Sequence, residues 1–380
     1  MHTVGLIGYG ERGQFFAKVI RENFRDRAKI TAVIDSDHTA QDKAWSDADD
    51  AGLAVPVWFR SVQALAANPV YMPSVFVIAT NPQHHCEQVV MAAEHGCHVF
   101  CEKPLTFDVS EAEKMCRAVQ SAGVVATVDF ETVFTDAFWQ LETYMRADGF
   151  GKLLRFDGYD NGRCPAYDML TCLPHYLHAA MHLAGAPPIQ MSASVLVDGH
   201  LACGSDEVVT PVRALYPQGR DYGRKLGVRA DTIEATYIFQ GGLVARFALH
   251  AFDEEYVAEA GRGLQHPGGE FMHFVVTGTR GQIKFHQAEG GSVYIKPVPQ
   301  DTRTEMSWVP VPALWSPDPD CTVGTVRLME DFFSAIEYKR APAITFEDAK
   351  MVTHMMSGIY ASHFRDKRLA LLLLVVDDQR

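Results

Sequence analysis

Over the first 125 residues, short apolar runs typical of buried strands alternate with segments whose apolar positions have helical spacing. Short, continuously apolar runs predict buried strands at residues 4–7, 30–34, 75–79, 99–101 and 124–128. Apolar positions at helical spacing predict helices at residues 13–24, 61–67, 84–95 and 110–121. Because apolar strands alternate with helices, we expect a parallel sheet that is covered on both faces.

The pattern changes after residue 125, where longer strand-like runs follow one another. We expect a helix at residues 174–183, closing helices at 327–337 and 346–363, and strands at 188–197, 232–240, 243–250, 271–278, 282–286 and 292–297. Gly241 and Gly242 indicate a hairpin turn. Residues 298–320 are expected to form a long surface loop, and residues 369–376 a buried strand. The chain thus divides into an α/β domain (1–124) and an α+β domain (125–380) with a large open, predominantly antiparallel sheet.

Composition and charge exclude several classes of function. The 380 residues carry 34 basic and 47 acidic side chains, a net charge of −13 that opposes binding to nucleic acid. The longest apolar run is too short to span a membrane. The eight cysteines show no Cys-x-x-Cys pair, and the chain opens directly on a strand. We therefore expect a cytoplasmic protein with reduced thiols.

A glycine-rich turn follows the first strand and opens the first helix. Gly8, Gly10 and Gly13 form a Gly-x-Gly-x-x-Gly motif, in which the glycines allow a tight turn, close approach of a pyrophosphate and close helix–strand packing. The pyrophosphate would lie at the helix N-terminus. This motif predicts a Rossmann domain whose cofactor site includes the intervening Tyr9, Glu11 and Arg12.

The end of the second predicted strand indicates which dinucleotide binds. Asp35 lies where a carboxylate meets the ribose 2′-hydroxyl of NAD. Asp37 follows, and no arginine or lysine occurs between Asp35 and Lys43, although His38 could soften this negative charge. Two carboxylates would repel a 2′-phosphate, so NAD is expected rather than NADP.

A lysine directly after a predicted strand is the first candidate for chemistry. Lys103 follows Glu102 and precedes Pro104 at the carboxyl end of the strand over residues 99–101, where ligands bind in open α/β sheets. Its ammonium could stabilise an alkoxide or polarise a carbonyl. The spacing alone equally allows a surface lysine paired with Glu102.

With these residues, the sequence resembles the glucose–fructose oxidoreductase / inositol dehydrogenase / MocA (Gfo/Idh/MocA) family. The resemblance rests on the glycine motif, Asp35, residues 78–85 and 96–105 with their Glu-Lys-Pro segment, His175, the turn at 276–281 and the closing helices. It implies NAD(P)-dependent hydride transfer to or from a sugar, sugar acid or cyclitol. Lys103 would be the catalytic lysine. The nicotinamide-side contacts would come from Thr80, Asn81, His85, Glu102 and Lys103.

The sequence departs from the family pattern at two places. The family often has Thr-Pro-Asn where this chain has Thr80, Asn81 and Pro82. Many members also carry Asp-x-x-x-His on a helix of the second domain, where this chain has Thr171 and His175. The resemblance makes His175 the general acid/base, with His178 as a second catalytic candidate.

Threonine at position 171 can hydrogen-bond but cannot stabilise an imidazolium as a carboxylate does, so another group would orient His175. Asp160, Asp168 and His178 are candidates by sequence proximity. Arg163 and Thr171 are expected to contact substrate. No metal site is expected, because His175, His178 and His182 spread over about 10 Å of helix.

The sequence leaves three functions open. The first is hydride transfer to or from a carbohydrate-like alcohol or ketone, with Lys103 stabilising the alkoxide. The second keeps the cofactor but recycles it tightly bound during elimination or glycoside cleavage, or reduces an imine. The third is a non-catalytic NAD-binding regulator, which the Glu102-Lys103-Pro104 segment argues against. An open sheet face usually needs covering, so a homodimer or homotetramer is expected.

Overall fold

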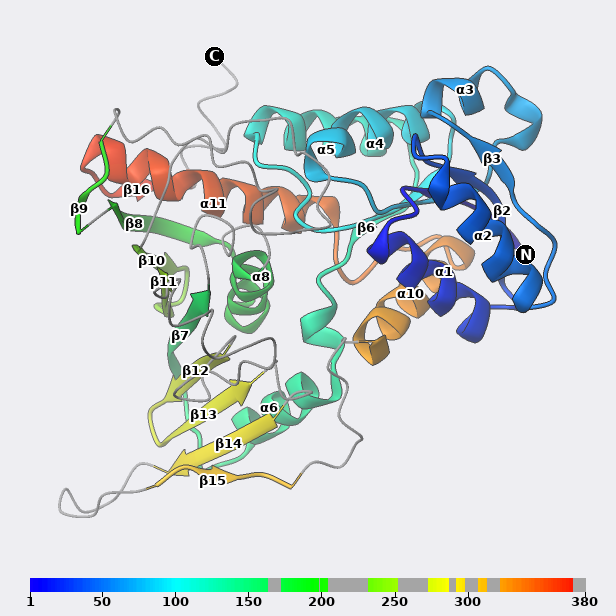
Figure 1. Ribbon diagram of the computed structural model, residues 1–380. Helices are drawn as coiled ribbons and strands as arrows, with labels where there is room; N and C mark the ends of the chain where they lie inside the picture. The colour runs from blue at the N-terminus through cyan, green and yellow to red at the C-terminus, as the bar shows by residue number, and fades with distance from the viewer. Residues whose placement is uncertain are drawn as a thin grey trace, which may run out of the picture. The chain divides into compact units, whose positions relative to one another are not determined.

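The computed structural model describes residues 1–162, 172–197, 199–203, 232–251, 273–286, 292–297, 307–312 and 322–371. The chain forms two compact units, which are described separately (Figure 1). Unit 1 comprises Met1–Phe130 and Thr325–Thr353, and unit 2 comprises Glu131–Gly324 and His354–Arg380.

The core of unit 1 is a six-stranded sheet in which every described pairing is parallel. Its strand order is β3-β2-β1-β4-β5-β6, the order of a dinucleotide-binding Rossmann domain. The strands are β1 (His2–Ile7), β2 (Ala28–Ile34), β3 (Val57–Phe59), β4 (Val75–Ile78), β5 (His98–Cys101) and β6 (Ala126–Val128). The prediction of a buried parallel sheet is confirmed.

Helices cover both faces of this sheet (Figure 1). Phe16 of α1 and Phe332 of α10 both pack edge-on against Phe100 of β5, while α4 and α5 lie together on the opposite face. A left-handed Gly123, with φ of 64°, ends α5. The helices are α1 (Glu11–Asn23), α2 (Thr39–Asp50), α3 (Val62–Ala66), α4 (His85–Glu94), α5 (Val109–Ala122) and α10 (Thr322–Glu337), with 3₁₀ turns η1 (Pro69–Tyr71) and η2 (Pro82–His84).

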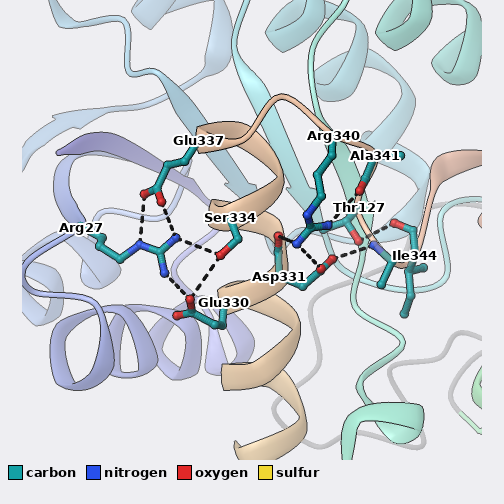
Figure 2. Close-up of polar contacts among 10 residues, drawn as sticks. Arg27, Thr127, Glu330, Asp331, Ser334, Glu337, Arg340, Ala341 and Ile344 are labelled. Carbon is teal, nitrogen blue, oxygen red and sulfur yellow. Dashed lines mark hydrogen bonds and ion pairs between the residues drawn. The ribbon is translucent and has the colours of Figure 1, made fainter.

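The segment Thr325–Thr353 returns to unit 1 from far along the sequence (Figure 2). Arg27 forms ion pairs with Glu330 and Glu337 of α10. Asp331, also on α10, accepts a hydrogen bond from Arg340 beyond the helix, and Thr127 Oγ1 donates to Ile344 O at 2.8 Å. The sequence-based boundary at residue 124 therefore differs from the structure twice, because β6 completes the first sheet and this late segment packs with it.

Unit 2 is built on a ten-stranded sheet in the order β15-β14-β13-β12-β7-β11-β10-β8-β16, with β9 paired to β8. Only the β7–β11 pair is parallel among the described pairings, so the predicted predominantly antiparallel sheet is confirmed. Its strands are β7 (Leu153–Gly162), β8 (Pro188–Val197), β9 (His200–Leu201), β10 (Thr232–Phe239), β11 (Val244–Ala251), β12 (His273–Gly278), β13 (Gly281–His286), β14 (Ser292–Pro297), β15 (Val309–Pro310) and β16 (Leu369–Ala370).

The turn between β10 and β11 is the predicted glycine hairpin, since Gly241 and Gly242 have φ angles of 94° and 92°. One face of the sheet carries the aromatic core, where the rings of Phe156, Phe274 and Phe285 stack in a row. α6 and α8 cover this face through Phe138 and Tyr176. The helical segments are η3 (Glu131–Phe134), α6 (Asp136–Arg146), α8 (Leu173–Ala184) and α11 (Phe346–Arg365).

Two predicted segments are described only in part. Most of the expected loop over 298–320 lies outside the described residues, and β15 falls within it. The apolar run from Leu369 begins with β16, which pairs with β8, and its remainder after residue 371 is not among the described residues. Within the described residues, no helix combines the length and apolar character needed to cross a membrane.

Candidate functional site

Five loops leave the carboxyl edge of the unit 1 sheet together. Each first loop residue still bonds to the neighbouring strand: Ala79 N donates to Ile7 O, Glu102 N to Ile78 O, Asp129 N to Cys101 O, Gly8 N to Ile34 O and Asp35 N to Phe59 O, at 2.8–3.0 Å. The glycine loop, Asp35, Thr80 and Lys103 therefore start from one edge. This is the edge where open parallel sheets bind ligands.

The glycine loop has the shape that a dinucleotide pyrophosphate requires. A Cβ on Gly13 would lie 2.1 Å from Gly8 O, and Gly8 adopts a φ of +88°, so neither position accepts another side chain without strain. A Cβ on Gly10 would meet no atom within 4 Å, which leaves open space above the first turn of α1. The backbone N–H groups of that turn and this open space fit a bound pyrophosphate. Glu11 lies exposed in the turn, so its backbone is what the site would use.

A hydrogen bond between Asp35 and the backbone of Tyr9 fixes the glycine loop to the end of β2. Both carboxylate oxygens of Asp35 accept backbone hydrogen bonds, Oδ2 from Tyr9 N at 2.8 Å and Oδ1 from Asp37 N at 2.9 Å. A carboxylate oxygen accepts more than one hydrogen bond, so a ribose hydroxyl can still donate to Asp35. The Tyr9 side chain is buried and its hydroxyl donates to Asp47, so only its backbone belongs to the loop surface. Burial, with Asp47 nearby, raises the pKa of Tyr9 to about 12 despite Arg21.

Arg12 connects the glycine loop to two buried acids. Its guanidinium pairs with Glu102 and with Asp129, the latter at 2.8 Å from Nη2 to Oδ2. It also lies over the rings of Phe15 and Phe16. Burial alone would raise the pKa of Glu102, but the charges of Arg12 and Lys103 outweigh it and lower that pKa. Glu102 is thus a buried, negatively charged carboxylate that its ion pair with Arg12 holds in place. Asp129 is a site residue that the motif analysis missed.

The Glu102 carboxylate also positions the backbone of Lys103. Its backbone N–H donates to Glu102 Oε2 at 2.7 Å, and its side chain is half-buried. The Lys103–Pro104 peptide bond is cis. Lys103 is therefore held at the loop start by its own backbone, with Arg12 and Glu102 as supports.

The loop after β4 is organised by His85. This ring is fully buried, with Nε2 3.0 Å from Thr80 O and Nδ1 3.1 Å from Pro104 O and 3.0 Å from Leu105 O. Burial lowers the pKa of His85 although these carbonyls oppose the shift. His85 thus ties the Thr80 loop to the Lys103 loop instead of facing a cofactor. Thr80 Oγ1 donates to Gln88 at 2.6 Å, and Asn81 precedes η2 with its side chain uninvolved in capping.

A cation that sequence spacing did not reveal lies at the end of β3. Arg60 donates from Nη2 to His38 Nδ1 at 3.2 Å. Because β3 pairs beside β2, Arg60 reaches the loop that follows Asp35, although it is 25 positions later (60 − 35) in the sequence. A negatively charged ligand group at the end of β2 would therefore be attracted by Arg60 and repelled by Asp35 and Asp37.

In unit 2, helix α8 carries the three predicted histidines. It is buried from Leu173 to Met181, Pro174 lies in its first turn, and Gly185 ends it with a φ of 64°. His175 is 3% exposed, and its Nδ1 lies 3.5 Å from Oε2 of Glu131 in η3. His182 lies at the exposed end of the helix, where Nε2 is 3.0 Å from Glu142 Oε1.

His178 differs from both of its neighbours. Burial, with a smaller contribution from His182, lowers the pKa of His178 to about 3. The lowered pKa favours the neutral imidazole at neutral pH, which makes His178 poorly suited to act as a general acid. We accordingly assign His178 no acid–base role.

We predict that His178 makes the protein sensitive to acid. A pKa lowered in the folded state means that the unfolded chain binds the proton more tightly, so stability falls as pH drops from about 6.5 towards 3. At pH 5 the expected loss is about 2 kcal/mol relative to pH 7. Urea unfolding at both values should show a smaller acid loss for His178→Gln than for wild type. The exposed-histidine control His200→Gln should keep the full loss, and an equal loss in His178→Gln would refute the prediction.

Two predicted substrate contacts, and two residues expected to orient His175, are not among the described side chains. Arg163, Asp168 and Thr171 lie outside the described residues, and so does the side chain of Asp160. Their roles stay predictions. Cys86, Cys97, Cys101 and Cys116 are free, buried thiols.

Comparison with known families identifies the class of unit 1. Residues 2–130 match the model of the oxidoreductase family with an NAD-binding Rossmann fold, known as Gfo/Idh/MocA. Residues 2–130 therefore resemble the NAD-binding Rossmann domain of this oxidoreductase family. This agrees with the glycine loop and strand order described above.

Individual relatives match over shorter stretches. The chain is 30% identical over 111 residues to scyllo-inositol 2-dehydrogenase (NAD(+)) of Bacillus subtilis (strain 168), covering 27% of this chain and 32% of that protein. It is 29% identical over 120 residues to D-glucoside 3-dehydrogenase of Escherichia coli (strain K12), covering 28% and 34%. The matched segment thus spans about a third of each relative's length. A solved structure of levoglucosan dehydrogenase with NADH and levoglucosan has the same fold, with a TM-score of 0.71, 19% identity, and 97% and 99% coverage.

Proposed function

We propose that this protein is an NAD-dependent oxidoreductase acting on the hydroxyl or carbonyl group of a carbohydrate-like substrate, a sugar, sugar acid or cyclitol. The observation that carries the proposal is Lys103, which follows β5 at the same sheet edge as the glycine loop. Its backbone N–H donates to the buried Glu102, which is paired with Arg12. The relatives named as inositol and glucoside dehydrogenases support the same substrate class.

The chemistry divides between two groups of the chain. When bound, NAD⁺ accepts a hydride from the carbon that bears the hydroxyl. The Lys103 ammonium stabilises the negative charge that develops on that oxygen. His175 takes the hydroxyl proton, so the C–H and O–H bonds break, a C=O bond forms, and the products are a ketone, NADH and a protonated histidine. The reverse reaction uses the same groups.

The cofactor site would be formed by the glycine loop with Asp35, and by Thr80, Asn81, Glu102 and Lys103. Tyr9, Glu11 and Arg12 contribute backbone or support, and His85 acts by holding the two loops together. The test of the proposal is NAD⁺ reduction by the purified protein across sugars, sugar acids and cyclitols, followed at 340 nm. Reduction with one chemical class supports the proposal, and complete absence of reduction, with NAD shown to bind, argues against it.

We predict that NAD⁺ is preferred over NADP⁺. Asp35 and Asp37 place two carboxylates where a 2′-phosphate would lie, whereas Arg60 and His38 offset part of their repulsion. The expected kcat/KM ratio favours NAD⁺ by about tenfold or more, which is 1.4 kcal/mol or more. Arg60→Ala should lower the residual NADP⁺ activity and leave NAD⁺ activity unchanged. Equal activity with both cofactors would contradict this prediction.

We also propose a homodimer or homotetramer in the cytoplasm. α6 and α8 cover one face of the unit 2 sheet, and the opposite face presents one cross-strand row of largely polar side chains. A second copy of the chain could cover this row. The row runs through Thr236, Arg246, Asp157, Val275, Lys284 and Tyr294.

A further inference from the structure

The helix that carries His175 brings a carboxylate to it from another part of the chain. Glu131 lies in η3, directly after unit 1, and its Oε2 is 3.5 Å from His175 Nδ1. Both side chains are buried, with 9% of Glu131 and 4% of His175 exposed. A carboxylate this deeply buried is costly unless it is paired or hydrogen-bonded, so the proximity of an imidazole nitrogen is energetically meaningful.

The position of Glu131 is fixed by close backbone packing. A Cβ on Gly324, at the start of α10, would lie 2.6 Å from Glu131 O and 3.1 Å from Thr135 Cγ2. Thr135 Oγ1 donates to Thr132 O at 2.8 Å, and the same oxygen accepts from Phe138 N to cap α6. The turn is therefore held on both sides. Glu131 can act as a rigid support for a side chain on α8.

The histidines of α8 differ in their burial and in the exposure of their carboxylate partners. His178, one turn later, is kept neutral by burial, as its pKa of about 3 shows. His182 has a carboxylate partner in Glu142, but the pair is exposed, with 41% and 24% of the two side chains accessible. In the His175–Glu131 pair, by contrast, both side chains are buried.

We infer that Glu131 is the positioning residue of His175, and that it takes the place of the carboxylate that Thr171 does not supply. This inference rests on the proposed function. Nδ1 of His175 carries the proton and faces Glu131, which leaves Nε2 as the nitrogen that exchanges a proton with the substrate hydroxyl. The 3.5 Å separation in the resting protein shortens as the imidazole becomes positively charged.

The first test is kinetic. Glu131→Gln keeps the size of the side chain and removes its charge, so we expect kcat to fall about 10- to 100-fold while the KM for NAD⁺ and the melting temperature stay near wild type. The matched control is Glu142→Gln, which removes the carboxylate from the exposed histidine of the same helix and should leave kcat unchanged. Equal kcat values for the two variants would overturn the inference, and so would loss of NAD⁺ affinity in place of kcat.

The second test does not depend on turnover. Imidazole ¹⁵N NMR of histidine-labelled wild type, with the His175 signals assigned by their absence in His175→Gln, reports which ring nitrogen carries the proton. We expect the Nδ1–H form of His175 in the wild type. An Nε2–H form would overturn the role of Glu131 even if the enzyme is active. If no substrate is turned over but the Nδ1–H form is found, the proposed reaction fails and the pairing stands.

Discussion

Replacing Lys103 by methionine is expected to lower kcat by about 10²- to 10³-fold, the usual effect of removing one group that stabilises a developing oxyanion. Methionine keeps the length of the side chain and removes the ammonium. Glu102 and Arg12 remain paired, because Glu102 reaches Lys103 through the backbone N–H, which the substitution retains. The dissociation constant for NADH should therefore stay near wild type.

The matched control is Lys114→Met, which removes an exposed lysine from α5 of the same unit. It should leave both kcat and NADH binding unchanged. Stopped-flow or steady-state turnover of the two variants, with NADH binding followed by fluorescence, separates chemistry from affinity. Wild-type turnover in Lys103→Met would remove this lysine from the reaction.

The second large effect concerns the glycine loop. A Cβ on Gly13 would lie 2.1 Å from the backbone oxygen of Gly8, so α1 and the loop must separate in Gly13→Ala. Overpacking of this kind costs about 3 kcal/mol, which lowers the melting temperature of a unit of this size by about 6–12 °C. NADH binding should be lost with it, because the same turn forms the pyrophosphate site.

Gly10→Ala is the matched control for this loop. Its backbone, with φ of −72°, is one that alanine adopts, and its Cβ would meet no protein atom within 4 Å. The melting temperature should therefore stay at the wild-type value, while the added methyl group enters the pyrophosphate space and weakens NADH binding about tenfold or more. Calorimetry of both variants with and without NADH makes the comparison. A stable Gly13→Ala or a Gly10→Ala with full affinity would contradict the described loop.

The parallel sheet could be predicted because its strands are apolar and local in sequence. Elements with a weak hydrophobic signal were missed. α2 buries only Ala40, Ala44 and Ala48, whose small side chains barely register as a helical stripe. β7 lacks a clear apolar alternation, because the core-facing Gly158 lies against Phe247 without a side chain of its own and the neighbouring Asp157 lies on the opposite face. α10 returns to unit 1 by packing Phe332 on Phe100 and by pairing with Arg27 some 300 residues away, contacts that no local pattern encodes.

The residues of the candidate site also divide into those that local sequence predicts and those that only the fold brings together. The glycine loop, Asp35 and the Glu102-Lys103 segment were predictable because each directly follows an apolar strand. Asp129 carries the same signal after β6, and this could have identified it. Arg60 and Glu131 act through neighbours that are distant in sequence, so only the fold brings them to Asp35's loop and to His175. His85 and His178 were assigned from the family resemblance, which does not report their burial, a property of the tertiary structure.

The central claim is that this protein transfers a hydride between a carbohydrate-like substrate and free NAD. The most direct measurement is the stoichiometry of NADH formed to ketone formed, by absorbance and mass spectrometry, for the substrate that emerges from the panel of sugars, sugar acids and cyclitols. We predict a ratio of one in the wild type and almost no product in Lys103→Met. Product without accumulation of NADH would show a recycled cofactor, and bound NAD with no product from any substrate would show a protein that does not catalyse this reaction; either result contradicts the claim.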